Sequence, residues 1–245
     1  MIYYGLIGYP LTHSASARLF ADKFRREKIT DRQYLLFPLE DLSMLSRLIQ
    51  EHPLLRGLNV TIPYKEKILP FLDEIDPAAA EIGAINTIVI KKSDTGSKLK
   101  GYNTDVTGFL NSADFSGHSR ALILGTGGAS KAVAAALKSK GIEITFVSRN
   151  SAGKDVVKYS SLTQEMIHEN TLIVNATPLG MFPMIHSFPP IPYKALTRFH
   201  FLYDLVYNPN ITEFIKMGMA EGCHVQNGWN MLLMQAEKSY EIWNA

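Results

Sequence analysis

The sequence predicts an α/β protein of two lobes, and two observations carry that prediction. Apolar residues 121–124 lead into a glycine-rich turn and a helix of small residues, which is typical of the phosphate-binding corner of a Rossmann-type βαβ unit. The residues before this unit alternate short apolar strands with amphipathic helices, which is typical of a separate mixed α/β lobe. A chain of 245 residues is long enough for two such lobes, each with its own core.

The N-terminal lobe is expected over residues 1–104 and begins with an apolar strand at 2–8. A helix follows from about Ser14, and its periodicity puts apolar side chains on one face and the charges from Lys23 to Lys28 on the other. The further elements expected in this lobe are a strand at 33–37, a helix at 42–51, a strand at 57–61, a short helix from Lys65, and a hairpin of strands 84–90 and 97–101 around a turn at 93–96.

The second lobe is expected over residues 105–225. Its predicted elements are a helix from about Asp105, strand 121–124, helix 129–140 ended by Gly141, strand 142–147, and strands at 172–174 and 201–205. Helices at about 211–221 and 228–243 close the chain, and the proline-rich stretch 178–200 is expected as an extended loop.

Composition indicates an ordinary globular protein, with 46% hydrophobic and 20% charged residues. A net charge of +2 without a basic run disfavours nucleic acids and membrane surfaces as partners. No apolar run reaches the roughly 20 residues that span a bilayer, and the N-terminus lacks the pattern of a signal peptide. The single cysteine, Cys223, fits a reducing cytoplasm and has no evident basic partner that would make it a nucleophile. We therefore expect a cytoplasmic protein that acts on a small molecule, and the sequence leaves both a monomer and a homodimer open.

The turn at residues 125–130 is the predicted cofactor site. Gly125 allows a tight turn, and Gly127 lets the backbone approach a pyrophosphate. The N-terminus of the following helix offers unpaired N–H groups to the phosphates. Ser130 stands where the fingerprint has its third glycine, so a dinucleotide is predicted from a near match.

The residues after the second strand of this unit favour NADP over NAD. NAD-binding sequences place a carboxylate there for the ribose hydroxyls, whereas this chain has Ser148-Arg149-Asn150. The guanidinium of Arg149 is suited to pair with a 2′-phosphate. Lys154 is a weaker candidate for a second positive charge near the same phosphate. The alternative is that Arg149 is a solvated arginine at a strand end.

Polar residues of the first lobe gather in four short segments at junctions between elements, where α/β folds place ligands. The segments are 13–16, 59–65, 83–87 and 101–105. They supply hydroxyls, amides, one ammonium and one carboxylate, a set suited to a polyhydroxylated ligand. We interpret His13 as a structural residue and expect no metal, since no second His or Cys stands at ligand spacing.

Six motifs occur in order along the chain, and they are Gly-Tyr-Pro-Leu-Thr-His-Ser-Ala-Ser, Asn-Val-Thr-Ile-Pro-Tyr-Lys, Gly-Ala-Ile-Asn-Thr, Gly-Tyr-Asn-Thr-Asp, Asn-Ala-Thr-Pro-Leu-Gly-Met and Gln-Asn-Gly-Trp-Asn-Met-Leu-Leu-Met-Gln. With the glycine turn, this series resembles the shikimate dehydrogenase family over essentially the whole chain. The resemblance implies reversible, NADPH-dependent reduction of 3-dehydroshikimate to shikimate in aromatic amino acid biosynthesis. It also implies that the first lobe binds substrate and is completed by the C-terminal residues from about 226 to 245.

The resemblance also implies a role for each matching position. Lys65 and Asp105 match the family's catalytic pair. Among the substrate-binding positions, Ser14 and Ser16 match those that hold the carboxylate. Thr61, Asn86 and Gln235, together with Asp105, match those that bond the ring hydroxyls and the carbonyl, with Tyr207 nearby. The cofactor-binding positions are Gly125, Thr126, Gly127, Gly128 and Ala129 at the phosphate turn, Ser148, Arg149 and Asn150 on the adenosine side, and Leu205 and Gly228 in the nicotinamide pocket. Without the resemblance, Lys65 would be taken for a surface lysine of a first helical turn and Asp105 for a helix cap.

Two departures from the family pattern and three alternative functions remain to be tested. The family usually has proline after Ser16 and, a little later, a His-Asn pair, where this chain continues Ala-Arg-Leu-Phe-Ala; the crossover at 151–170 is also short. A quinate/shikimate dehydrogenase with relaxed cofactor use would carry an acidic residue near Arg149. A catalytically silent dinucleotide-binding module would lack Lys65 or Asp105. Metal-dependent hydrolysis would need a ligand cluster, which the sequence lacks.

Overall fold

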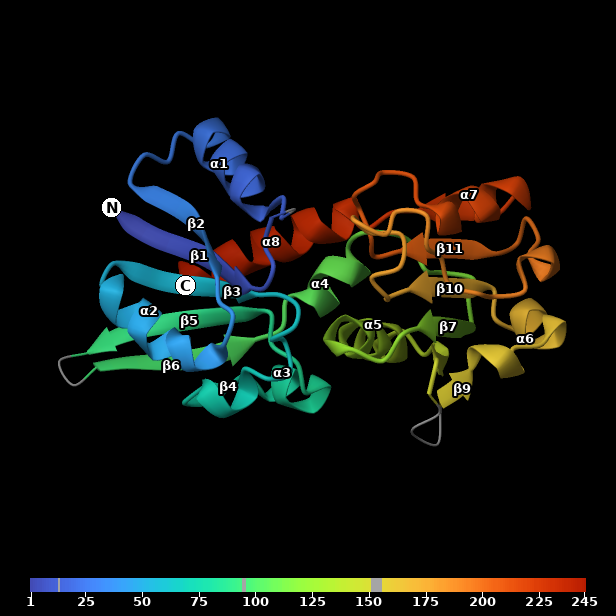
Figure 1. The fold of residues 1–245 in the computed structure, drawn as a ribbon, viewed down its shortest axis with the longest axis horizontal. Coiled ribbons are helices and arrows are strands. Elements are labelled where there is room, and N and C mark those ends of the chain that lie inside the picture. Colours follow the sequence, from blue (N-terminus) through green and yellow to red (C-terminus); the bar gives the residue numbers. More distant parts are fainter. Residues whose placement is uncertain (13, 94–95, 151–155) are drawn as a thin grey trace. The chain divides into compact units, whose positions relative to one another are not determined.

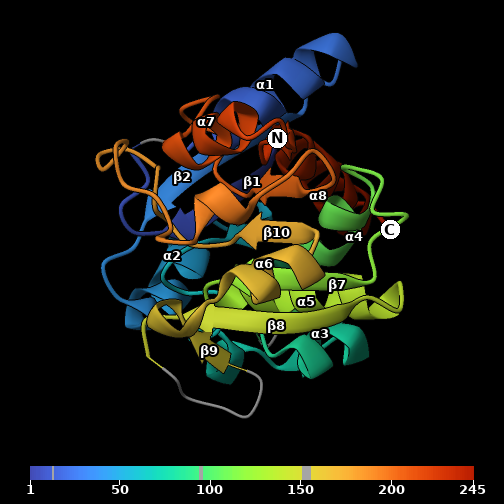
Figure 2. The same cartoon turned by 90° about the vertical axis from the view of Figure 1, so that its right-hand side faces the viewer.

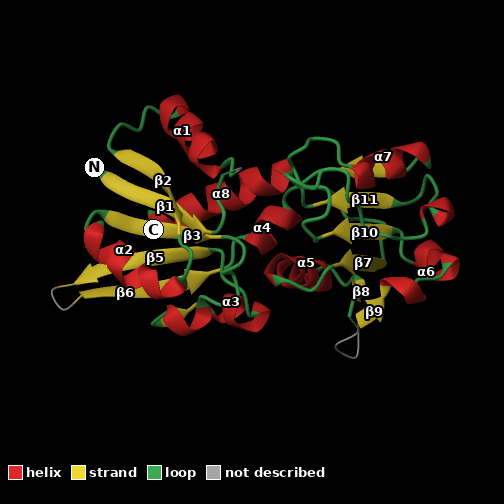
Figure 3. Cartoon of the chain, in the orientation of Figure 1, coloured by secondary structure: helices red, strands yellow, loops and turns green. Residues whose placement is uncertain are grey.

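The structure is a computed structural model of the 245-residue chain, and it describes residues 1–12, 14–93, 96–150 and 156–245 (Figure 1). Contacts divide the chain into two compact units. The first unit is Met1–Thr104 with Gln235–Ala245, and the second is Asp105–Met234. Strands and helices alternate in both units (Figure 3), which confirms the predicted α/β class with its C-terminal return to the first unit.

A six-stranded mixed sheet forms the first unit, in the order β2-β1-β3-β5-β6-β4. The strands are β1 (Ile2–Gly8), β2 (Arg32–Pro38), β3 (Leu55–Val60), β4 (Glu74–Ile75), β5 (Thr87–Ser93) and β6 (Gly96–Tyr102). The helices are α1 (Ser16–Arg26), α2 (Leu45–Glu51), α3 (Pro77–Ile82) and the second part of α8 (Trp229–Trp243). β1 pairs in parallel with β2 and β3, whereas β5 is antiparallel to β3 and β6.

Aromatic side chains fix α1 and α8 to one face of this sheet. Tyr34 stacks on Phe20 at 4.2 Å between ring centroids, and Tyr4 stacks on Trp243 at 4.6 Å. A Cβ added to Gly57 would collide with the indole of Trp243, so glycine is required where α8 crosses β3. The apolar residues of α2 join the core of the same unit with those of β3 and β5.

The second unit contains a six-stranded parallel sheet in the order β12-β11-β10-β7-β8-β9. The strands are β7 (Arg120–Leu124), β8 (Glu143–Ser148), β9 (Val156–Lys158), β10 (Leu172–Asn175), β11 (Phe201–Asp204) and β12 (His224–Gln226). The helices are α4 (Asp105–Leu110), α5 (Gly128–Ser139), α6 (Gln164–Glu169), α7 (Glu213–Ala220) and the first part of α8. Figure 2, turned toward this unit, shows β7, β8 and β10 among α5 and α6.

Separate core clusters line the two faces of the parallel sheet. Phe109 of α4 and Val133 of α5 belong to one cluster, and Ile167 of α6 and Phe214 of α7 belong to the other. Helices on both faces leave the carboxyl ends of the parallel strands at one edge, which is where such sheets bind ligands.

Most predicted strands and helices are present with ends shifted by one to three residues, but no helix begins at Lys65. Residues 65–68 form turns, followed by a short 3₁₀ helix at Leu69–Phe71. The Lys65 carbonyl accepts a hydrogen bond from Ile85 N at 2.7 Å, and the Tyr64 hydroxyl donates to the Leu39 carbonyl at 2.6 Å. Tertiary partners therefore hold this segment where a helical ladder was predicted.

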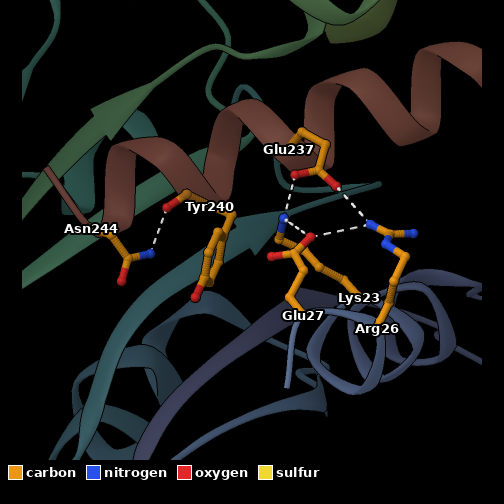
Figure 4. Close-up of polar contacts among 6 residues, drawn as sticks. All are labelled: Lys23, Arg26, Glu27, Glu237, Tyr240 and Asn244. Carbon is orange, nitrogen blue, oxygen red and sulfur yellow. Dashed lines mark hydrogen bonds and ion pairs between the residues drawn. The ribbon is translucent and has the colours of Figure 1, made fainter. Parts of the chain in front are cut away.

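The predicted solvent-facing position of Lys23 on α1 is also wrong. Lys23 is buried, and its ammonium forms an ion pair with Glu27 at 2.9 Å and another with Glu237 of α8 (Figure 4). Burial lowers the pKa of Lys23, but hydrogen bonds to the two carboxylates outweigh that effect, so the pKa is raised and the charge is kept. The ammonium also lies over the ring of Tyr240 on α8. The contacts of Lys23 with Glu237 and Tyr240 therefore connect α1 to α8.

The boundary between the units falls inside α8 at Gln235, whereas the sequence-based division assigned 226–245 to the first lobe. β12 pairs with β11, and Met231 belongs to a core cluster of the second unit. Ala236 and Trp243 instead pack in the first unit. None of the helices among the described residues is long and apolar enough to cross a membrane.

Candidate functional site

The three hydroxyl side chains predicted to bind substrate lie at one edge of the first sheet. Ser14 and Ser16 follow β1, Thr61 follows β3, and these two strands are parallel neighbours. The backbone N–H of Ser16 donates to Ser14 Oγ at 3.3 Å, and that of Thr61 donates to the Ile7 carbonyl at 2.9 Å. All three side chains are half-buried, so part of each remains accessible to a ligand.

A buried polar network holds the predicted ring-binding residues at the same edge. Asn86 directly precedes β5; its Nδ2 donates to Thr104 Oγ1 at 2.9 Å, and its Oδ1 accepts from Thr104 N at 2.7 Å. Asn86 Nδ2 also lies 3.4 Å from Gln235 Oε1 on α8. Ser239, one turn further along α8, contacts Thr87 Oγ1 at 2.8 Å and Thr104 Oγ1 at 3.1 Å. The network brings Asn86 and Gln235 together although they are far apart in the sequence.

Lys65 and Asp105, the predicted catalytic pair, are each anchored beside this network. The Lys65 carbonyl is bound by the N–H of Ile85, the residue before Asn86, and the lysine side chain is half-buried. Asp105 directly follows Thr104, is buried, and opens α4 as the first residue of the second unit. The backbone therefore links both residues to Asn86. Lys65 is linked through the hydrogen bond to Ile85, and Asp105 is linked through Thr104, which is hydrogen-bonded to Asn86.

The predicted phosphate turn joins β7 to α5 in the second unit. Gly125 has φ +110° and its N–H donates to the Val147 carbonyl at 2.7 Å, which holds the turn against β8. A Cβ at Gly125 would lie 3.2 Å from the Ala176 carbonyl, so glycine is required there. Gly127, the N-cap of α5, has extended backbone and open space where a Cβ would stand. The N-terminus of the helix is thus open to a pyrophosphate.

The predicted adenosine-side residues follow β8, next to this turn. Ser148 ends the strand, and Asn150 N donates to Ser148 Oγ at 3.4 Å. Arg149 is exposed, so its guanidinium is available to a ligand. Lys154 and His13 lie outside the described residues.

The positions expected to line the nicotinamide pocket are in close contact. A Cβ at Gly228 would collide with the carbonyl oxygen of Leu205, and Gly228 N donates to the Val206 carbonyl at 3.3 Å. Tyr207 packs edge to face against Trp229 at 6.0 Å between ring centroids. Among the described residues, no group of three His, Cys, Asp or Glu could hold a metal ion.

A buried carboxylate that the sequence did not single out lies at the end of β11. Asp204 is fully buried; its Oδ1 accepts from Asn175 Nδ2 at 2.9 Å and from Val206 N at 3.0 Å, and its Oδ2 accepts from Thr212 Oγ1 at 2.6 Å. Burial raises the pKa of Asp204 to about 6, and these hydrogen bonds limit the rise. A signal was present in the sequence, since a charged residue ended an apolar strand.

Residues 6–88 match the family model of the shikimate dehydrogenase substrate binding domain. A shikimate dehydrogenase (NADP(+)) of Clostridium beijerinckii is 41% identical over 99% of this chain and 92% of its own length. The chain belongs to the shikimate dehydrogenase family.

Solved structures of the family have the same fold. Shikimate dehydrogenase 1 of Peptoclostridium difficile is 37% identical, with a TM-score of 0.85 over 100% of this chain and 92% of that one. Shikimate 5-dehydrogenase of Thermus thermophilus, in complex with NADP(H) and shikimate, is 31% identical, with a TM-score of 0.85 over 99% of this chain and 93% of that one.

The two glycines of the phosphate turn are expected to respond differently to alanine. Gly125→Ala forces a side chain into positive φ and is expected to lower the free energy of unfolding by at least about 1–2 kcal/mol. A Cβ at position 127 has no neighbouring atom within 4 Å, so Gly127→Ala should change the free energy of unfolding by less than about 0.5 kcal/mol. Its Cβ nevertheless obstructs the approach of a pyrophosphate and is expected to raise the KM for NADP about tenfold. Urea denaturation and steady-state kinetics measure both, and an unchanged KM in Gly127→Ala would contradict the assignment.

The buried carboxyl of Asp204 is expected to make stability fall as pH rises. Its pKa of about 6 in the folded protein exceeds the ordinary value of 3.8, so its contribution is complete below about pH 4 and is lost as pH rises through 6. Between pH 4 and 7, the free energy of unfolding of the wild type should fall by on the order of 1–3 kcal/mol relative to that of Asp204→Asn. Urea denaturation of both proteins at the two pH values tests this, and a constant difference would contradict it.

Proposed function

We propose that this protein catalyses the reversible, NADPH-dependent reduction of 3-dehydroshikimate to shikimate in aromatic amino acid biosynthesis. The observation that carries the proposal is the polar cluster at one edge of the first sheet. Hydroxyls of Ser14 and Ser16, the amides of Asn86 and Gln235, and the ammonium of Lys65 all belong to segments that meet at this edge. They are the groups that a polyhydroxylated carboxylic acid requires.

Each polar group has a distinct role in binding the substrate. Ser14 and Ser16 bind the carboxylate through their hydroxyls. Thr61, Asn86, Asp105 and Gln235 bond the ring hydroxyls and the carbonyl, and Tyr207 completes this set. The hydrogen bonds between Asn86 and Thr104 support this role, because they fix the amide before a ligand arrives.

Lys65 provides the proton for the reaction. NADPH, when bound, supplies a hydride, and negative charge then develops on the carbonyl oxygen of the substrate. A positioned ammonium stabilises that charge and neutralises it by donating a proton. Asp105 accepts a hydrogen bond from a ring hydroxyl of the substrate. In the reverse direction, the Lys65 amine accepts the proton from the substrate hydroxyl.

The residues of the second unit fit NADP. The open N-terminus of α5 offers its first backbone N–H groups to the pyrophosphate, and Arg149 pairs with the 2′-phosphate. Ser148 and Asn150 contact the adenosine side, and Leu205 and Gly228 line the nicotinamide pocket. The absence of a carboxylate at 148–150 supports NADP over NAD.

An assay of purified protein with four pairs of reactants tests the function. Formation of reduced cofactor is followed by absorbance with shikimate or quinate as the reductant and NADP or NAD as the oxidant. Rapid turnover with shikimate and NADP is the expected result. Comparable rates with quinate and NAD would instead support the quinate/shikimate dehydrogenase, and cofactor binding without any turnover would support a silent module.

The proposal includes a cytoplasmic location and a monomer or homodimer. Cys223, the single cysteine of the sequence, is half-buried, and burial raises the pKa of its thiol to about 11, which suits a protein that does not depend on a disulfide. Cell fractionation and light scattering after gel filtration measure the location and the assembly.

A further inference from the structure

We propose that Asp204, Asn175 and Thr212 are positioning residues, which hold the loop that carries Leu205 and Tyr207 in the geometry needed to bind the nicotinamide half of the cofactor. The inference rests on the proposed function, because that function gives Leu205 and Tyr207 their ligands. None of the three positioning residues is assigned contact with substrate or cofactor.

The carboxylate of Asp204 fixes both ends of this loop. It accepts from the N–H of Val206, just after the strand, and from the hydroxyl of Thr212, where α7 begins. Residues 207–211 therefore lie between two anchors on one side chain. An ionised carboxylate has enough lone pairs for all three of its donors, and both its oxygens are used as acceptors.

Asn175 connects the same carboxylate to the neighbouring strand. Its Nδ2 donates to Asp204 Oδ1 at 2.9 Å, while its backbone carbonyl accepts from Leu205 N at 2.9 Å. Its Oδ1 accepts from the N–H of Thr177 at 3.1 Å and from the Thr177 hydroxyl at 2.6 Å. The ends of β10 and β11 thus form one network, and every polar atom of the Asn175 side chain is used in it.

Burial makes the network rigid. Asn175 and Asp204 are fully buried and Thr212 is 1% exposed, so water does not compete for these hydrogen bonds. Gly228 packs so closely against the Leu205 carbonyl that a Cβ at position 228 would collide with it. A displacement of about 1 Å in a site of this kind is enough to weaken binding and slow the reaction.

Thr212 offers the sharpest test, because its cap function has a matched control. Thr212 Oγ1 accepts from Ile215 N at 3.3 Å at the start of α7, and Thr163 Oγ1 accepts from Met166 N at 3.3 Å at the start of α6. Thr212→Val and Thr163→Val each lose a helix cap, but only Thr212→Val loses a bond to Asp204. Thr212→Ser keeps both interactions.

The experiment compares two ligands in binding titrations, NADPH and adenosine 2′,5′-bisphosphate, which lacks the nicotinamide half. We expect Thr212→Val and Asp204→Asn to raise the dissociation constant of NADPH about tenfold. The dissociation constant of the bisphosphate should stay within twofold of the wild-type value. Thr163→Val and Thr212→Ser should leave both within twofold. Equal weakening of both ligands in Thr212→Val, or unchanged NADPH affinity in both Thr212→Val and Asp204→Asn, would overturn the inference.

The kinetic arm separates this inference from the proposed function. With shikimate, Thr212→Val is expected to lower kcat/KM at least tenfold, and Thr163→Val is expected to match the wild type. If the wild type did not oxidise shikimate, the proposed function would fail, while the ratio of the two binding constants would still decide the role of the network. Thermal unfolding of each variant identifies any that does not fold, and if Thr212→Val is one of them, Asp204→Asn provides the test.

Discussion

Replacing Lys65 with alanine is expected to lower turnover of shikimate by about 10²–10⁴-fold, the usual contribution of a positioned general acid or base. The lysine is the cation that the proposed function places at the developing oxyanion, so its loss removes both charge stabilisation and the proton. Binding of shikimate should weaken only modestly, because the hydroxyl and amide groups remain. Steady-state kinetics with varied shikimate and NADP separates the two effects as kcat and KM.

The fold is expected to survive this substitution. The structure uses the carbonyl of Lys65, bound by Ile85 N, and the half-buried side chain belongs to none of the core clusters. Lys67, an exposed lysine of the same segment, provides the control, and Lys67→Ala should keep wild-type turnover. Near-normal turnover in Lys65→Ala would remove the lysine from the mechanism.

The elements that could be predicted from sequence are those with a pattern of their own. β7 and β8 were predicted to within one residue because glycines mark their ends: the apolar residues 121–124 lead into the glycine turn, and strand 142–147 begins directly after Gly141. The β5–β6 hairpin was predicted from its turn at 93–96. β4, β9 and β12 were missed since each has two or three residues and exists only through pairing with a neighbour. Pattern along the chain does not encode such pairing.

The polar groups also divide into those that the sequence located and those that only the three-dimensional contacts show. Motifs located the phosphate turn and the four polar segments, because glycines, hydroxyls and amides at element junctions are visible in the sequence. The ion pair of Lys23 with Glu237 could not be predicted, since Glu237 stands 214 positions away. Asp204 and Thr212 were missed because neither is assigned ligand contact, and their role follows from burial and shared hydrogen bonds.

Replacing Arg149 with alanine is expected to raise the KM for NADP by about 30–100-fold and to change the KM for NAD by less than about twofold. A charge-assisted pair with a phosphate contributes about 2–2.7 kcal/mol, which corresponds to that range. NAD has no 2′-phosphate, so it loses nothing that the guanidinium provides. The ratio of kcat/KM for the two cofactors, measured with shikimate, gives the change in preference directly.

Two further conditions distinguish this role from that of a solvated arginine. Arg198, an exposed arginine of the same unit, is the matched control, and Arg198→Ala should leave both KM values unchanged. The wild-type preference for NADP should also narrow as salt is raised, because an exposed ion pair is screened, whereas Arg149→Ala should show little salt dependence. Equal losses with NADP and NAD would mean that Arg149 supports the adenosine in general, and preference for NADP would then depend on other residues of the loop after β8.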